Sequence, residues 1–406
     1  MMQQPYDVVV IGGGAVGSAI ARELSRYRLR IAVVERAHSA GGQAGGRATG
    51  LLHAGVLYRP GTLKAVCAVE GSQEFDAVAA ELDVPFRRTG GLIVGFTDGD
   101  RKRLEQLLAQ GRANGVRGLE LIGRRRMDAL EPCAGGSFAL WCPASGVLDP
   151  RAYTAALAEN AVRNGVEYFL GCSFTGETRL PGGGHVLHTT WGDLRTRWVV
   201  NSAGLNSAAV SGQLGIPGYA IQPVEDEYIA LEQPAGRAVR MPVCPVPGPD
   251  GPCPPCAAPT ADGGLLLGPV SRPAPPPGSA PSAQDILGGL AAGRVSHLLP
   301  QLDRARPLRS FAGVQPHRVD PATGAAGDFV LELRDEAPGV VNLVGIGPPG
   351  LTSALPLARR AVSLIQFQEP LSPNPDFDPR RRGARGFSGA GGRTAAPGLK
   401  RGGSPA

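Results

Sequence analysis

Three glycines near the N-terminus have the spacing of a loop whose backbone contacts a phosphate group. The pattern G-x-G-x-x-G is formed by Gly12, Gly14 and Gly17, and Ala15 opens the helix expected to follow. In such a loop the first glycine permits a tight turn, the second lets the backbone approach a pyrophosphate, and the third lets the helix pack closely on a strand. The helix N-terminus adds unpaired N–H groups and the positive end of a dipole. These residues therefore predict contacts to a dinucleotide.

An acidic residue follows at the distance that a dinucleotide site requires. Glu35 lies 18 residues after Gly17, close to the usual spacing of about 20. A carboxylate there accepts hydrogen bonds from the ribose hydroxyls of adenosine and disfavours a 2′-phosphate, which argues against NADP. We expect Glu35 and the adjacent Arg36 to contact the cofactor. The alternative is a glycine-rich turn in an unrelated α/β protein.

The residues around this loop predict the elements that position it. A β-branched run at 6–11 is typical of a buried strand, 15–27 has a helical pattern, and 30–35 is a second buried strand. Together they make one βαβ unit. Further strands are expected at 91–96, 165–169, 198–201 and 340–344, and helices at 62–82, 101–114, 151–164 and 352–366.

Several segments in order along the chain carry a resemblance to a known family. They are residues 45–55, 60–65, 69–71, 164–167, 200–205 and 345–352. From Asp7 to Ile365 the chain resembles the FAD-dependent oxidoreductases of the D-amino-acid oxidase superfamily. Within it, the resemblance is closest to L-2-hydroxyglutarate dehydrogenases and to the FAD subunits of anaerobic glycerol-3-phosphate dehydrogenases.

The resemblance implies that the cofactor is FAD and extends the set of contacts. The added cofactor-binding residues are Arg47, Ala48, Thr49, Gly204, Gly345, Gly347, Gly350, Leu351 and Thr352. In the family, the last loop faces the isoalloxazine ring. A glycine-rich loop before a helix lets N–H groups and the helix dipole stabilise the reduced, anionic flavin.

The resemblance also implies an α/β fold in which a Rossmann-like FAD-binding domain is interleaved with an antiparallel-sheet substrate domain. The FAD-binding domain would comprise residues 1–85, 147–215 and 305–368, and the substrate domain 86–146 and 216–304. Residues 369–406 lack periodicity and are rich in Gly, Pro, Ser and Arg. We expect them to form a disordered basic tail.

One histidine lies in a segment that the resemblance places at the flavin. Oxidation of a substrate by flavin moves a hydride to the ring and a proton to a base, and histidine titrates near working pH. His53 is therefore the first candidate for the catalytic base. The alternatives are a histidine that only packs or hydrogen-bonds, and one that carries a covalent flavin link.

Two departures from the family pattern concern the substrate. Gln315 follows Gly-Val where close relatives often have an arginine, whose fork pairs with carboxylate or phosphate. Gln315 is the second catalytic candidate, but it cannot supply that charge; His317 and Arg318 are candidates to compensate. Residues 225–228 read Glu-Asp-Glu-Tyr, and three carboxylates near the roof of the site would repel an anionic substrate.

The expected activity is oxidation, by hydride transfer to FAD, of a small polar secondary alcohol such as glycerol 3-phosphate or an L-2-hydroxy acid. The first alternative is an amine or amino-acid oxidase on the same fold. The second is a flavin-binding electron-transfer subunit that oxidises no small molecule itself. Expected partners are the small-molecule substrate and an electron-acceptor subunit or quinone.

Charge and cysteine usage restrict the partners and the compartment. The net charge is +6, and residues 371–406 hold seven Lys/Arg against two Asp/Glu, so the body is nearly neutral and is not built to bind nucleic acid.

Seven scattered cysteines do not look like a disulfide framework, and Cys253 and Cys256 are expected to be unpaired thiols, with no metal site. Without a membrane-length apolar run or a signal peptide, we expect a cytoplasmic protein. The basic tail is either solvated or in peripheral contact with a membrane.

Overall fold

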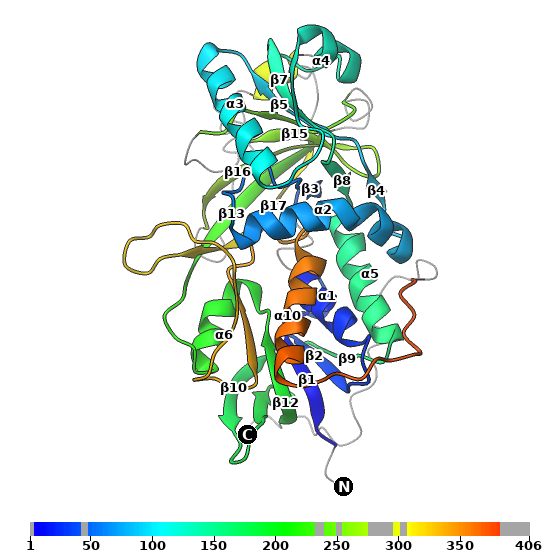
Figure 1. The fold of residues 1–406 in the computed structure, drawn as a ribbon, viewed down its shortest axis with the longest axis vertical. Coiled ribbons are helices and arrows are strands. Elements are labelled where there is room, and N and C mark those ends of the chain that lie inside the picture. The colour runs from blue at the N-terminus through cyan, green and yellow to red at the C-terminus, as the bar shows by residue number, and fades with distance from the viewer. Residues whose placement is uncertain are drawn as a thin grey trace.

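The structure is a computed structural model that describes residues 4–41, 48–231, 239–248, 254–274, 295–300 and 307–381. Figure 1 shows an elongated molecule with one sheet in its lower half and a second in its upper half. Helix α2 (Leu63–Leu82) crosses between them. Among the described residues, no helix combines the length and the hydropathy needed to cross a membrane.

The lower sheet has a parallel core. In spatial order its parallel strands are β9 (Glu167–Leu170), β2 (Ile31–Glu35), β1 (Tyr6–Ile11), β12 (Leu194–Asn201) and β19 (Val340–Val344). Two antiparallel additions complete it: the hairpin β10 (Phe174–Arg179) and β11 (His185–Thr189) beside the start of β12, and β18 (Val330–Leu333) beside β19.

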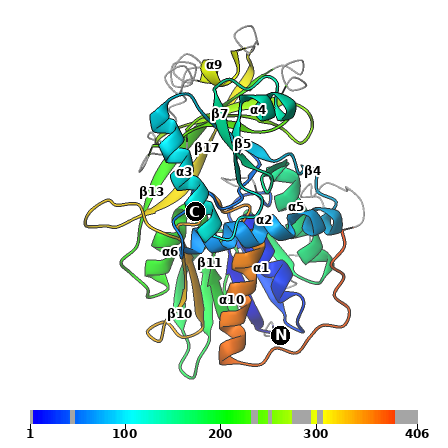
Figure 2. The same cartoon turned by 45° about the horizontal axis from the view of Figure 1, so that its top comes forward.

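Both faces of this sheet are covered, which explains the apolar runs at residues 8–11 of β1 and 31–34 of β2. Successive side chains of β1 enter different cores, because side chains alternate along a strand. Val8 and Val10 pack with α1 (Ala15–Leu24), α5 (Pro150–Arg163) and α10 (Ala354–Gln368), whereas Val9 and Ile11 pack on the side of α6 (Ser207–Gln213). Figures 1 and 2 show α1 and α10 side by side against the sheet.

The upper sheet is antiparallel except at one pair, β14 with β5. Its order is β17 (Pro307–Val319), β13 (Ala220–Leu231), β16 (Leu265–Pro273), β15 (Cys256–Pro259), β14 (Val243–Pro245), β5 (Gly91–Gly95), β7 (Phe138–Cys142) and β6 (Glu120–Gly123). Among the described residues, the helices on this half are α3 (Asp98–Ala113), α4 (Arg124–Leu130) and α9 (Val295–Leu298). A small third sheet joins the halves through β3 (Leu51–Leu52), β8 (Gly146–Leu148) and β4 (Phe86–Arg87).

The predicted fold class is confirmed: a Rossmann-like sheet is interleaved with an antiparallel sheet. One segment differs from the expected division of the chain. Residues 307–319, assigned from the sequence to the FAD-binding part, pair along their length with β13 in the upper sheet. Strand β17 is therefore part of the roof of the site, and the chain returns to the lower sheet only at β18.

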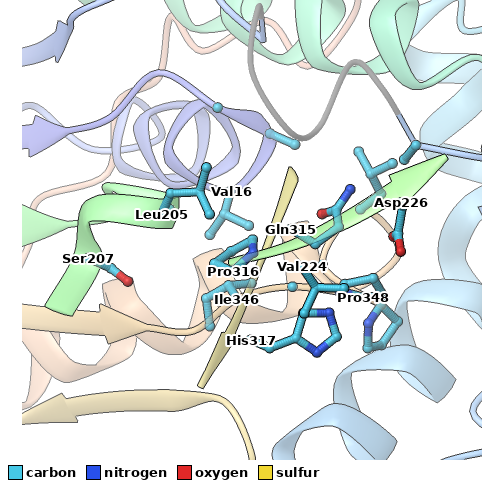
Figure 3. Close-up of a pocket in the computed structure, with 18 of the residues that line it drawn as sticks. Val16, Leu205, Ser207, Val224, Asp226, Gln315, Pro316, His317, Ile346 and Pro348 are labelled. Atoms are coloured by element: carbon cyan, nitrogen blue, oxygen red, sulfur yellow. The ribbon is translucent and has the colours of Figure 1, made fainter. Parts of the chain in front are cut away.

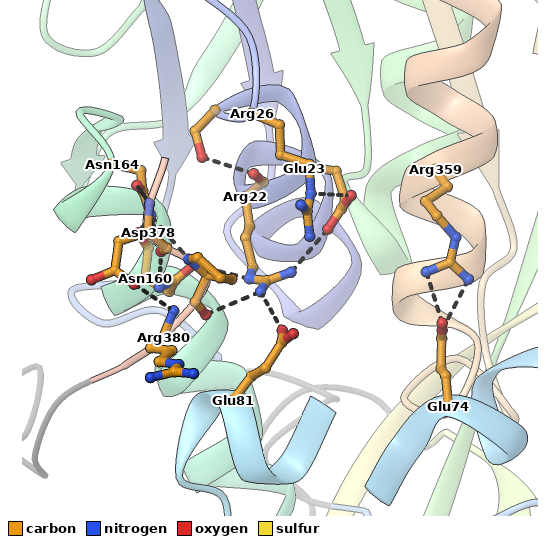
Figure 4. A network of polar contacts seen from close by, with 12 residues as sticks. Arg22, Glu23, Arg26, Glu74, Glu81, Asn160, Asn164, Arg359, Asp378 and Arg380 are labelled. Atoms are coloured by element: carbon orange, nitrogen blue, oxygen red, sulfur yellow. Dashed lines mark hydrogen bonds and ion pairs between the residues drawn. The ribbon is translucent and has the colours of Figure 1, made fainter. Parts of the chain in front are cut away.

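The expectation of a disordered tail is wrong for residues 369–381, which we name the C-terminal strap. Figure 4 shows polar contacts from the strap to α1 and α5, and the Arg381 N–H also donates to the Glu81 carbonyl of α2 at 2.9 Å. Arg22, only 2% exposed, donates to Asn160 Oδ1 at 2.9 Å and to the Pro379 carbonyl at 3.2 Å. The carbonyl of Asp378 accepts from Asn160 Nδ2 at 3.1 Å. The strap thus satisfies buried polar groups that the helices leave open; residues 382–406 lie outside the described residues.

Arg381→Ala is expected to lower the free energy of unfolding by about 2 kcal/mol. The Arg381 guanidinium forms an ion pair with Glu159 at 2.5 Å, and both side chains are largely buried, so the variant leaves a carboxylate without its partner. Arg380→Ala is the matched control, because Arg380 is exposed and should change stability by less than about 0.5 kcal/mol. Urea unfolding of both variants measures the difference, and equal midpoints would show that the strap does not stabilise the fold.

The cysteine prediction also needs correction. Cys244 and Cys256 form a disulfide with their Cα atoms 4.3 Å apart. They lie opposite each other on β14 and β15, one residue from the paired Val243 and Ala257. Unpaired thiols were therefore the wrong expectation for Cys256, while Cys253 lies outside the described residues. Buried free thiols are present at Cys67, Cys142 and Cys172.

Candidate active site

A cavity of about 780 Å³ lies between the two sheets. Its floor comes from the carboxyl ends of β1 and β2, and its roof from β13 and β17. This volume falls within the range of about 300–1,000 Å³ usual for small-molecule sites. The position also agrees with the rule that open α/β sheets bind ligands beyond the carboxyl ends of their strands.

The three glycines of the loop between β1 and α1 have different surroundings. Gly12 has φ +104°, and a Cβ there would lie 2.5 Å from the Ser202 carbonyl oxygen. A Cβ on Gly17 would lie 1.9 Å from the Gly12 carbonyl oxygen. A Cβ on Gly14 would meet nothing within 4 Å. The outer glycines are thus required by backbone packing, whereas the middle one borders open space in the cavity.

The acid at the end of β2 is fixed in place by backbone groups. Glu35 is 7% exposed, and its two carboxylate oxygens accept from Gly13 N and Ala37 N, each at 2.7 Å. Each oxygen keeps a second lone pair for a ligand hydroxyl. The carboxylate is therefore oriented before any ligand binds, at the edge of the cavity next to the glycine loop.

The histidine predicted from the sequence lines the cavity directly after β3. The His53 backbone N–H donates to Thr352 Oγ1 at 3.0 Å, which ties this segment to the start of α10. The His53 ring contacts Tyr58 through Nδ1 and the phenol oxygen, 3.1 Å apart. Burial lowers the pKa of His53 to about 4. The imidazole is thus neutral at pH 7, the state in which it can accept a proton.

The roof presents a carboxylate and an amide to the cavity. Strands β13 and β17 pair with Val224 opposite Gln315 and Asp226 opposite Gly313, so Asp226 and Gln315 are diagonal neighbours on one face. Figure 3 shows both side chains on these strands at the cavity. Ser271 Oγ donates to Asp226 Oδ1 at 2.6 Å. Burial raises the pKa of Asp226.

Only one of the three expected roof carboxylates reaches the cavity, because side chains alternate along β13. Glu225 lies on the opposite face and forms an ion pair with Arg272 at 3.0 Å. Glu227 lies on that face too and also pairs with Arg272. The prediction that three carboxylates repel an anionic ligand is therefore wrong for Glu225 and Glu227, and of the three Asp226 alone faces the cavity.

Most of the predicted site residues come together around this cavity. Those that line it are Gly12, Gly14, Ala15, Gly17, Glu35, Arg36, Ala48, Thr49, His53, Gly204, Gln315, Gly347, Gly350 and Leu351. Two lie behind its wall instead. Gly345 donates its N–H to Ser207 Oγ at 3.3 Å, and Thr352 receives the His53 N–H. Arg47 lies outside the described residues.

Several cavity residues were not selected from the sequence. They are Tyr58, Arg103, Cys172, Ser173, Phe174, Tyr228 and Ser271. The segment 172–174 had a usable signal, because it follows a strand of the parallel sheet at its carboxyl end. Arg103 and Ser271 had no such sequence signal. They belong to a helix and a strand, and which of their faces borders the cavity depends on how distant segments pair.

The family model described as FAD-dependent oxidoreductase matches residues 7–364. Among curated relatives, a glycerol 3-phosphate dehydrogenase of Caloramator mitchellensis is 30% identical over 391 residues, covering 93% of this chain and 77% of the relative. A mitochondrial L-2-hydroxyglutarate dehydrogenase of Caenorhabditis elegans is 28% identical over 402 residues, covering 88% and 92%.

Solved structures show the same architecture. An FAD-bound, dithionite-reduced L-α-glycerophosphate oxidase from Mycoplasma pneumoniae superposes with a TM-score of 0.84 at 25% identity, covering 93% of this chain and 99% of the other. A glycine oxidase from Geobacillus kaustophilus has a TM-score of 0.78 at 22% identity, covering 94% and 100%. The second likeness concerns the fold alone.

Proposed function

The chain belongs to the family of FAD-dependent oxidoreductases, and from this premise we propose that it oxidises the CH–OH group of a small polar secondary alcohol. The names of the relatives supply the substrate type: glycerol 3-phosphate and L-2-hydroxyglutarate are both secondary alcohols. The observation that carries the proposal is His53, a neutral imidazole in the cavity with one ring nitrogen engaged by Tyr58.

The cavity residues fit FAD. The open space before Gly14 leaves room for a pyrophosphate at the N-terminus of α1, where N–H groups and the helix dipole favour anions. Glu35 would accept the ribose hydroxyls through its remaining lone pairs. When bound, FAD supplies the ring that accepts a hydride from the substrate carbon.

The substrate proton requires a base, and His53 meets the requirement at Nε2. We assign the ring proton to Nδ1, which then donates to the Tyr58 oxygen 3.1 Å away and leaves the lone pair on Nε2. Tyr58 is a positioning residue: it selects the tautomer and the orientation of the ring. His53 then takes the hydroxyl proton as the hydride leaves the carbon.

We include the electron acceptor in the proposal: a quinone or a partner electron-transfer subunit reoxidises the flavin. Support comes from the dehydrogenases that match 93% and 88% of this chain. Single-turnover reoxidation by a soluble quinone should be at least about tenfold faster than by air-saturated buffer. Faster reoxidation by O₂ would assign an oxidase instead.

Product analysis tests the proposed reaction. The holoprotein is incubated with secondary alcohols and an artificial electron-accepting dye, and the mixture is assayed for ketone and for ammonia. We expect at least one alcohol to yield a ketone, in an amount equal to that of the reduced dye. Ammonia released from amines, with no ketone from any alcohol, would favour the amine-oxidase alternative and overturn the proposal.

The low pKa of His53 gives a distinctive pH dependence. Only the neutral ring accepts a proton, so the rate of flavin reduction should stay level from pH 8 to about pH 5 and fall as the pH approaches 4. If the base were a histidine with the ordinary pKa of about 6.5, the rate of flavin reduction would already be about tenfold lower at pH 5.5. Anaerobic rapid mixing across this range measures the profile, and a midpoint near 6.5 would contradict the buried environment derived for His53.

A further inference from the structure

The charges around the cavity are unevenly distributed. Within the described part of the chain, the charged side chains that line it are Glu35, Arg36, Lys64, Arg103 and Asp226. Glu35 and Arg36 stand beside the glycine loop and belong to the dinucleotide end. The remaining three are the charged groups available to a substrate.

The two cations of this set are engaged by other parts of the protein. Lys64 Nζ donates to the Gly327 carbonyl at 2.9 Å and lies 5.3 Å from the centroid of the Phe329 ring. Arg103 lines the cavity from α3 and donates through Nη1 to the Gln106 side chain at 3.1 Å, while its buried Nε has no hydrogen-bond partner among the described residues. Neither cation stands on the roof strands beside Gln315.

The two histidines add no positive charge near neutral pH. Burial lowers the pKa of His53, and burial together with Lys64 lowers that of His317. Burial therefore favours the neutral form of both rings. On the roof strands β13 and β17, the charged side chain that lines the cavity is that of Asp226.

Asp226 stands in a polar cluster suited to hydrogen-bond donors. Its Oδ1 accepts from Ser271, itself a cavity residue, and Tyr228 also donates to the carboxylate. Gln315 is 6% exposed and projects from the neighbouring strand (Figure 3). An amide and a carboxylate accept hydrogen bonds from hydroxyl or ammonium groups. A phosphate or carboxylate at this place would meet a like charge in a poorly solvated space.

We propose that Asp226 and Gln315 are specificity determinants that select an alcohol bearing a hydroxyl or ammonium group, and no anionic group, at the roof end of the cavity. The inference rests on the proposed oxidation of a secondary alcohol and names its substrate class. Neutral polyols and amino alcohols share the required chemistry, and the test distinguishes them.

The direct test is binding by three probes of similar shape that lack a transferable hydrogen: tert-butylammonium, tert-butanol and pivalate. The probes are titrated into the oxidised holoprotein, and the dissociation constant is read from the change in the visible flavin spectrum. Pivalate should bind at least about tenfold more weakly than the tighter of the other two, since a charged hydrogen bond contributes about 1.5–3 kcal/mol. A preference for tert-butylammonium identifies amino alcohols, and equal binding with tert-butanol identifies polyols.

Two variants should shift the order of probe affinities away from the cation and toward the anion. Gln315→Arg introduces a fork that pairs with carboxylate and should tighten pivalate binding about tenfold or more. Asp226→Asn removes the charge and should reduce any preference for tert-butylammonium. Glu225→Gln is the matched control, because this neighbouring carboxylate pairs with Arg272 on the opposite face and should leave the order unchanged. Flavin content and thermal midpoint verify that each variant is folded.

The outcomes separate this inference from the proposed function. The inference is overturned if pivalate binds most tightly to the unaltered protein, or if Gln315→Arg leaves its affinity unchanged. The reaction is tested separately with glycerol, 1-amino-2-propanol and glycerol 3-phosphate. If glycerol 3-phosphate reduces the flavin faster than the other two alcohols, the proposed oxidation stands and the proposed selectivity is rejected. Failure of all alcohols to reduce the flavin would reject the proposed function, whatever the probes show.

Discussion

Gly14→Val is expected to abolish FAD binding. The space in front of Gly14 is open, and a branched side chain would fill it where the pyrophosphate must approach the backbone. A hydrogen bond to a charged group contributes about 1.5–3 kcal/mol, so losing two weakens binding about 10²- to 10⁴-fold. The measurement is the flavin-to-protein ratio after gel filtration.

Two controls separate lost binding from misfolding. Gly14→Ala should keep the thermal midpoint of the apoprotein, because its Cβ has no protein atom within 4 Å. Gly212→Val makes the same exchange at an exposed helical glycine whose Cβ also meets nothing, and it should keep full flavin content. Full flavin occupancy in Gly14→Val would show that the glycine loop is not where the cofactor binds.

The second large effect is expected at His53. His53→Ala should retain flavin, because in the proposed mechanism His53 acts on the substrate and it does not belong to the glycine loop. Its rate of flavin reduction by substrate should fall about 10²- to 10⁴-fold, the usual contribution of general base catalysis. Anaerobic rapid mixing with saturating substrate measures this rate.

Variants of Tyr58 and of the remote His188 show whether the loss of rate is specific to His53. Tyr58→Phe removes the acceptor of Nδ1–H and should slow reduction by about tenfold, equivalent to one hydrogen bond of about 1.4 kcal/mol. His188→Ala alters a partly exposed histidine of β11, which contacts Asp193 in the turn before β12, and should have no effect on the rate. An unchanged rate in His53→Ala would remove this residue from the mechanism.

The lower sheet was predictable because its signals are local. Residues 8–11 of β1 are apolar because this part of the strand is covered on both faces, and the glycine pattern follows it immediately. Helix ends were less well predicted. The helix expected from residue 101 begins at Asp98, because Thr97 and Asp100 form a capping box that extends it.

The roof and the strap depended on contacts between distant segments. Asp226 faces the cavity, and Glu225 and Glu227 do not, because β13 pairs with β16 and β17 in one particular register. The sequence displays three adjacent acids and no sign of which one points inward. The strap has no periodicity of its own: it is ordered by buried polar groups such as Arg22.

The anaerobic visible spectrum of the purified protein tests the central claim most directly. It is recorded before and after addition of small secondary alcohols, starting with glycerol, 1-amino-2-propanol, glycerol 3-phosphate and L-2-hydroxyglutarate. Oxidation by hydride transfer to FAD predicts a flavin band that bleaches with at least one of these alcohols and returns when an electron acceptor is added. A protein without a flavin band, even after incubation with FAD, or a band that amines bleach and alcohols leave unchanged, would contradict it.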